Sequence, residues 1–269
     1  MSDKKNNLCK SLLAVVAIVA VTLALAACGQ DQGQGAAGEQ RSFSADSTIN
    51  PEAVLQDMAR VLRSTEAFSV HVEKVFDEVL RDGAKVQYAG AADVSIRRPD
   101  RFHVDYGDDL SAKEAWYDGE HFTLLDHLHN VYAQVPAAPP IKNVLNLLEN
   151  DYDVFLPLAG LLRPDPSKEY GEGAHAQRYL GIHDVDGWAC HHLLFQGDRV
   201  DWQLWVEASD QPLLRKVVVT YKKIEGSPQH VALLTDWQLE PSLDDGQFVA
   251  ALPEDAVRAE VLTKNGGRP

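Results

Sequence analysis

Cysteine is scarce in this sequence, which has three in 269 residues. Cys9 and Cys28 lie near the N-terminus, so Cys190 is the one cysteine of the remaining sequence. A disulfide within that remainder is excluded, and its fold must be held by a hydrophobic core. We expect Cys190 to be buried and unreactive, because a buried cysteine behaves as a small hydrophobic residue.

Positive charge is also in short supply. The sequence has 25 Lys and Arg against 40 Asp and Glu, which gives a formal net charge of −15. A chain this acidic is not expected to bind nucleic acid through its overall field. Anionic lipid headgroups would repel it as well, so attachment to a membrane cannot rest on a basic surface.

The N-terminus carries an apolar segment that is short for a membrane span. Lys4, Lys5 and Lys10 flank its start, and the apolar run covers residues 11–24, whereas a spanning helix needs roughly 20 residues. Basic residues, an apolar run and small residues in this order are typical of an export signal. Two other interpretations are a plain secretory signal cut at Ala27 and a short transmembrane helix.

The residues Leu25-Ala26-Ala27-Cys28 resemble the lipobox of bacterial lipoproteins. That resemblance implies a signal peptide over residues 1–27, cleavage before Cys28 and a diacylglycerol on the sulfur of Cys28. The acylated Cys28 would then anchor the chain to a membrane. Gly29 follows the cysteine, and by the sorting rule of such lipoproteins it implies the outer membrane, with the chain facing the periplasm.

The composition of the rest of the chain indicates three segments, a tether, a domain and a tail. Residues 28–49 are rich in Gly, Gln and Ser and cannot bury enough apolar surface to fold, so they predict a flexible tether behind the lipidated cysteine. Residues 50–262 are long enough for one domain, and residues 263–269 are expected to form a disordered tail.

The domain is predicted to begin with a helix and to continue as strands. Asn50 suits the N-cap and Pro51 the first helical position, and the apolar spacing indicates an end near Ser64. Beyond it, apolar and polar residues alternate between Asp-Gly and Pro turns, which predicts an antiparallel meander of ten or eleven strands in a barrel or sandwich. Two short apolar helices, 141–148 and 155–162, interrupt it.

Four stretches carry a resemblance to a known fold. They are residues 117–132, 185–193, 201–206 and 212–217. Together with the order of the elements, they resemble the LolA/LolB-like fold and, more closely, a family of predicted periplasmic proteins known as a domain of unknown function. The resemblance covers roughly residues 50–255. It implies a mainly β (α+β) half-barrel, a curved unclosed antiparallel sheet with helices on its concave face.

One apolar face of this sheet is a candidate ligand cavity. The same alternation also predicts an ordinary filled core, and the sequence leaves both interpretations open. The strand residues predicted to line the cavity are Val70, Val72, Tyr88, Phe102, Val104, Phe122, Leu124, Trp202, Leu204, Val217, Val219 and Trp237. The residues predicted to form a lid are Ile141, Val144, Leu145, Leu148, Phe155 and Leu158.

Polar residues offer no clear catalytic or metal site. His191 and His192 are neighbours in a predicted strand and therefore point to opposite faces, so they cannot both bind one zinc ion. His127 and His129 lie in a predicted turn. Several acidic residues fall in turns or near the C-terminus, where solvated side chains are expected. They are Asp108, Asp109, Asp244, Asp245, Glu254 and Asp255.

These observations favour a binding protein over an enzyme. Relatives with this fold bind acylated lipoproteins or other lipids, or act as sensors in envelope stress signalling. We expect a membrane-anchored monomer that binds a hydrophobic ligand, the acyl chains of a lipid or lipoprotein, with no cofactor. The alternative is an envelope sensor or scaffold with a filled core and a protein partner. A hydrolase is the third candidate, and no nucleophile motif supports it.

Overall fold

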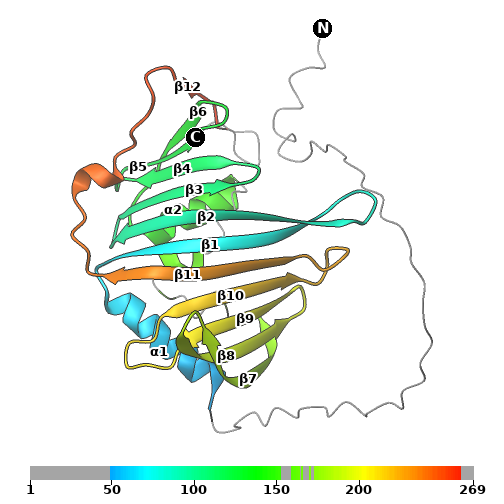
Figure 1. Cartoon of the computed structure of the whole chain (residues 1–269). Coiled ribbons are helices and arrows are strands. Elements are labelled where there is room, and N and C mark those ends of the chain that lie inside the picture. Colours follow the sequence, from blue (N-terminus) through cyan, green and yellow to red (C-terminus); the bar gives the residue numbers. More distant parts are fainter. Residues whose placement is uncertain (1–48, 153–158, 164, 166–169, 171–172, 262–269) are drawn as a thin grey trace, which may run out of the picture. The chain divides into compact units, whose positions relative to one another are not determined.

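The computed structural model describes residues 49–152, 159–163, 165, 170 and 173–261. Within these ranges the chain forms one β-sheet with helices against one of its faces (Figure 1). Several predicted features lie outside the described residues and stay predictions. They are the signal peptide 1–27, Cys28, the tether as far as residue 48, the lid residues Phe155 and Leu158, and the tail 263–269.

Twelve strands make up the sheet of the described residues, in the order β12-β6-β5-β4-β3-β2-β1-β11-β10-β9-β8-β7 (Figure 1). Their bounds are β1 Ala67–Val79, β2 Lys85–Arg97, β3 Arg101–Asp108, β4 Ala112–Tyr117, β5 His121–Asp126, β6 Val131–Pro136, β7 Ala174–Val185, β8 Trp188–Gly197, β9 Val200–Glu207, β10 Leu214–Tyr221, β11 Gln229–Leu239 and β12 Val257–Arg258. Because β7 and β12 are edges, the sheet is unclosed, and the predicted mainly β fold is confirmed.

Two antiparallel meanders meet in the middle of the sheet. Strands β1 to β6 form the first and β7 to β11 the second, and the pairing of β1 with β11 joins them. The predicted number of ten or eleven strands is confirmed for β1 to β11. The twelfth strand, β12, is parallel to β6 and has two residues. A strand this short shows no alternation by which the sequence could indicate it.

The turn between β7 and β8 has the conformation that its Asp-Gly sequence indicates. Between β7 and β8, Asp186 and Gly187 have φ values of 52° and 82°. Positive φ at both central residues is the type I′ turn, which matches the twist of the strands and favours glycine at its second position.

Helix α1, Pro51–Ser64, has the predicted bounds. The side chain of Asn50 accepts a hydrogen bond from the Glu52 N–H at 3.0 Å, so it caps the helix as expected. The other helices are α2 Ile141–Asp151, α3 Ala159–Leu162 and the 3₁₀ helix η1 Asp245–Phe248. In the described part of the chain, none of them has both the length and the apolar character that crossing a membrane requires.

The sheet has an inner face, against which α1 and α2 pack, and an outer face opposite (Figure 1). Side chains alternate between the two along each strand. The inner face carries a single large cluster of buried apolar residues, to which Leu55, Met58 and Leu62 of α1 contribute. Strand residues Phe68 and Phe102 are fully buried within it. The core therefore lies between the sheet and its two longer helices.

Candidate functional site

All twelve predicted cavity residues lie on the inner face. The strand register places all of them except Trp237, which lies in a β-bulge of the β1–β11 pairing and has its ring centre 5.5 Å from that of Phe68. Eleven of them belong to the inner cluster. The buried ones are Val70, Val72, Phe102, Phe122, Leu204, Val217 and Val219. The half-buried ones are Val104, Leu124, Trp202 and Trp237. Tyr88 lies on the same face beyond the cluster, with its ring centre 5.7 Å from that of Phe76.

The described residues of the predicted lid also pack onto the inner face. Ile141, Val144, Leu145 and Leu148 share one side of α2, and all four are buried in the inner cluster. Their spacing of three and four residues accounts for this, because such residues form one stripe along a helix. Helix α2 thus covers part of the inner face, and its role as a lid stays a prediction.

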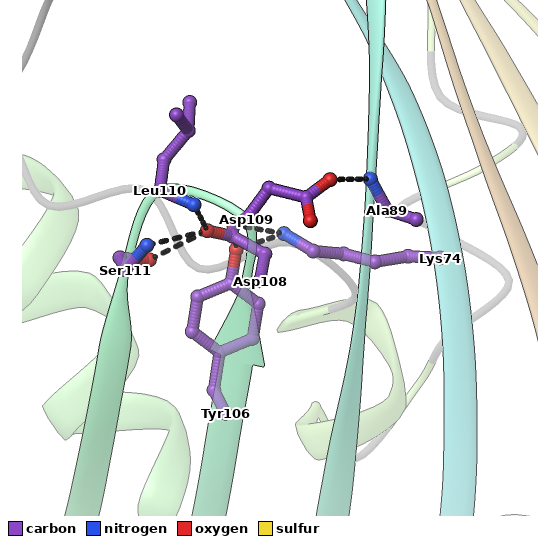
Figure 2. A network of polar contacts seen from close by, with 7 residues as sticks. All are labelled: Lys74, Ala89, Tyr106, Asp108, Asp109, Leu110 and Ser111. Atoms are coloured by element: carbon purple, nitrogen blue, oxygen red, sulfur yellow. Dashed lines mark hydrogen bonds and ion pairs between the residues drawn. The ribbon is translucent and has the colours of Figure 1, made fainter.

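A buried polar network interrupts the apolar inner face (Figure 2). The Lys74 ammonium, on β1, lies 3.2 Å from a carboxylate oxygen of Asp108 and donates to the Tyr106 hydroxyl. The Tyr106 hydroxyl donates to the same carboxylate oxygen. The other oxygen of Asp108 accepts from the Leu110 N–H at 2.8 Å and from the Ser111 N–H at 2.7 Å. Every oxygen and the ammonium of this network is therefore bonded.

Gly90 makes the network possible. It pairs with Lys74 on one side and with Asp108 on the other, so the three residues form a row across β1, β2 and β3. A Cβ at position 90 would lie 2.4 Å from the Cβ of Asp108 and 2.4 Å from the Gly107 carbonyl oxygen. With no side chain there, Lys74 can reach across β2 to the carboxylate.

Burial and ion pairing have opposite effects on the pKa values of Lys74 and Asp108. The side chains of Lys74 and Asp108 are 16% and 4% exposed. Desolvation lowers the pKa of Lys74, although the Asp108 carboxylate works against that change. For Asp108, desolvation would raise the pKa, but hydrogen bonds from Tyr106, Leu110 and Lys74 outweigh it and hold the pKa below its usual value. Desolvation and the neighbouring carboxylate raise the pKa of Tyr106.

Aromatic rings surround this end of the inner face. The Lys74 nitrogen lies 4.5 Å from the centre of the Phe76 ring, which is 5.5 Å from the ring of His230. The ring of Tyr221 lies 5.3 Å from that of His230. Desolvation, and then the charge of Lys74, lower the pKa of His230, which favours its neutral form. The inner face thus gains charged and polar side chains toward the β1–β2 hairpin.

The histidines behave as the strand geometry predicts. His191 contacts the Tyr179 hydroxyl at 3.1 Å, whereas His192 stacks on Trp205 with ring centres 3.9 Å apart on the outer face. Adjacent His191 and His192 therefore point to opposite faces, as expected. Burial lowers the pKa of His192 to about 4. Among the described residues, no three His, Cys, Asp or Glu side chains come together as a metal site needs.

The outer face carries a groove of about 520 Å³. Its walls include Trp188, Trp205 and Lys216, and Trp188 is 47% exposed. The Arg215 guanidinium lies 4.0 Å from the centre of the Trp188 ring and forms a buried ion pair with Glu207. A large exposed aromatic ring beside a groove is typical of protein interaction surfaces.

A second pocket, of about 180 Å³, lies beside the start of α2. Arg63, Arg98 and Lys142 line it together with Pro99 and the Pro140–Ile141 pair. Three basic side chains around one small pocket are unusual for a chain of net charge −15.

Residues 51–262 match the family described as "Predicted periplasmic protein (DUF2092)". The match covers most of the chain and nearly all of the predicted domain 50–262. The chain belongs to this family. No curated protein matches the DUF2092 chain.

Several solved structures are similar to the DUF2092 chain at low identity. An uncharacterized conserved protein from Thermus thermophilus is 10% identical over 77% of this chain and 97% of its own, with a TM-score of 0.46. The lipoprotein LppX from Mycobacterium tuberculosis is 14% identical over 72% and 97%, with a TM-score of 0.43. A LolA superfamily protein from Nitrosomonas europaea is 12% identical over 76% and 99%, with a TM-score of 0.34.

Sequence reasoning missed the polar residues of the DUF2092 inner face. The expectation that Asp108 is solvated is wrong, because its carboxylate is buried and bonded to Lys74 and Tyr106. The sequence did indicate the position of Lys74, because Lys74 continues the alternation that places Val70 and Val72 on the inner face. Arg98 was missed as well, because it follows the end of β2, where no periodicity applies. The expectation that Cys190 is buried is confirmed, and burial raises the pKa of its thiol to about 11.

Proposed function

We propose that this protein is a membrane-anchored periplasmic lipoprotein that binds a hydrophobic ligand, the acyl chains of a lipid or lipoprotein, against its inner face. The anchor is the acylated Cys28, and the outer membrane is its location. Binding involves no catalysis, and the chain acts as a monomer. The predicted signal peptide and the periplasmic family support the location.

One observation carries the proposed ligand. Val104, Leu124, Trp202 and Trp237 are half-buried although they adjoin fully buried apolar residues, and they come from both meanders. Apolar surface left accessible beside a core is what an acyl chain covers, since burying it releases about 25 cal/mol per Å².

The test uses the exported chain with Cys28→Ala, which removes the acylation site. Native mass spectrometry of the protein purified from cells is expected to show a bound lipid. Displacement of a dansyl-labelled fatty acid then gives an affinity. Trp202→Ala on the inner face is expected to lower that affinity about tenfold, because it removes a large apolar contact.

Trp188→Ala is the matched control, since it removes the same side chain from the outer face. It is expected to leave fatty acid affinity unchanged. Circular dichroism and the unfolding midpoint of each variant show that the fold is intact. If Trp188→Ala removes binding while Trp202→Ala keeps it, the inner-face site is wrong.

The outer groove favours a second candidate function, an envelope sensor or scaffold with a protein partner. Its support is the exposed Trp188 beside a groove of about 520 Å³. In that case the chain is free of lipid, and Trp188→Ala abolishes the capture of one defined partner from an envelope extract. Recovery of a lipid-free chain with such a partner would favour this function over the ligand-binding one.

A further inference from the structure

The pocket beside α2 has an unsatisfied arginine in its wall. The Nε and Nη2 atoms of Arg98 are buried, and within the described part of the chain neither has a hydrogen-bond partner. The third nitrogen, Nη1, donates to the Leu162 carbonyl oxygen at 3.4 Å, which is long for such a bond. Burial lowers the pKa of Arg98. A buried guanidinium of this kind lacks an acceptor, and an anion is the acceptor that suits it best.

The charges around the pocket leave an excess of positive charge. Arg63 is paired with Asp165 at 3.1 Å. Among the described residues, neither Arg98 nor Lys142 forms an ion pair with a carboxylate. The nearby Asp100 lies 3.3 Å from Arg101, which neutralises it. One anionic group in the pocket would therefore meet two cations that have no counter-ion.

The pocket also adjoins the inner cluster. The Arg98 guanidinium lies 5.9 Å from the centre of the Phe68 ring, and Phe68 belongs to the cluster. Ile141 lines the pocket and is buried in the same cluster. The pocket volume of about 180 Å³ is enough for one small polar group.

We infer that this pocket binds the anionic group, a carboxylate or a phosphate, of an amphiphile whose apolar part lies on the inner face. The inference rests on the proposed function and narrows its ligand to anionic amphiphiles. The Nε and Nη2 atoms of Arg98 are buried, so the guanidinium turns toward the pocket to donate its N–H groups to a planar or tetrahedral anion, and the exposed Lys142 adds a second positive charge.

The test compares palmitate with 1-hexadecanol, which has the same chain length and no charge. Both are titrated by displacement of a dansyl-labelled fatty acid from the exported Cys28→Ala chain. Arg98→Met is expected to lower the affinity for palmitate at least tenfold and to change that for hexadecanol less than twofold. Lys142→Met, at an exposed position, is expected to lower palmitate affinity several-fold.

Arg81→Met is the matched control, because it removes the same charge from the exposed β1–β2 turn. It is expected to change neither affinity. The unfolding midpoint of each variant reports folding, and Lys142→Met keeps the test valid if Arg98→Met does not fold.

The outcomes separate the two proposals. If the unsubstituted chain binds palmitate and both pocket variants bind it equally well, the anion pocket is overturned while the proposed function stands. If the unsubstituted chain binds neither amphiphile, the proposed function fails and the inference fails with it. An Arg98-dependent rise in the unfolding midpoint with inorganic phosphate, and no binding of palmitate, would assign the pocket to a free anion instead.

Discussion

At the scale of single residues, Gly90 decides whether β1 and β3 can share an ion pair. Lys74 and Asp108 belong to strands that are not neighbours, and β2 runs between them. A side chain on β2 at this position would occupy the space through which the lysine reaches. The missing side chain is therefore the structural requirement of the network, and the charges follow from it.

Gly90→Ala is expected to destabilise the fold by about 1–3 kcal/mol, because the new Cβ would clash with backbone and Cβ atoms that cannot simply rotate away. The control is Gly107→Ala, where a Cβ would meet nothing within 4 Å. That variant is expected to stay within about 0.5 kcal/mol of the original chain. Urea unfolding measures both, and equal losses would contradict the proposed role of Gly90.

The pH dependence of stability tests Asp108. Its pKa is lowered in the fold from the usual value of 3.8, so its ionised form adds stability that is fully present above that value. This stability is lost as the pH falls through the lower pKa of the folded state. Asp108→Asn is expected to cost about 1–3 kcal/mol at pH 7, because Lys74 loses its partner.

The same variant is expected to lose less stability than the original chain as the pH falls from 5 to below 3.8. Urea unfolding at a series of pH values gives both curves. Parallel curves would show that Asp108 does not contribute to the acid sensitivity of the fold.

At the scale of elements, alternation and end signals predicted most of the fold. Asn50 and Pro51 marked the start of α1, and the period of two marked β1 to β11. Strand β12 lacked any such signal because it consists of Val257 and Arg258 alone. The order of the strands, with β1 beside β11, depends on contacts between distant parts of the chain, which periodicity does not encode.

The candidate site was predictable only in its apolar part. The period of two places eleven of the twelve predicted cavity residues on the inner face. Trp237 is the exception, because a β-bulge lies between it and Thr235, whereas strict alternation with Val231 and Leu233 would place it on the outer face. Lys74 and Asp108 on the same face could not be assigned, since a charged residue in an apolar row is normally solvated. Their burial depends on Gly90 in a neighbouring strand, which only the register brings between them.

The cap of α1 gives a prediction for one element. Asn50→Ala is expected to destabilise the chain by about 1 kcal/mol, because the Glu52 N–H loses its acceptor at the helix start. Asn50→Ser keeps an oxygen acceptor and is expected to retain most of that stability. Thermal and urea unfolding compare the two, and an equal loss in both variants would exclude capping as the cause.

At the scale of the whole molecule, the net charge bears on how the protein attaches to a membrane. The net charge of −15 disfavours adsorption to anionic membranes, so the proposed attachment depends on the lipid at Cys28. Cys28→Ala is therefore expected to move the protein from the membrane fraction to the soluble periplasmic fraction. The measurement is fractionation followed by mass spectrometry of the N-terminal peptide. Retention of the variant in membranes would contradict anchoring through Cys28.

Photo-crosslinking can show whether the inner face binds an acyl chain. A fatty acid with a diazirine in its chain is bound to the exported Cys28→Ala protein, irradiated and mapped residue by residue. Labels are expected on inner-face residues of both meanders, such as Leu124, Trp202 and Trp237. Labels confined to the outer face around Trp188, or no labelling above that of an unrelated soluble protein, would contradict acyl-chain binding at the inner face.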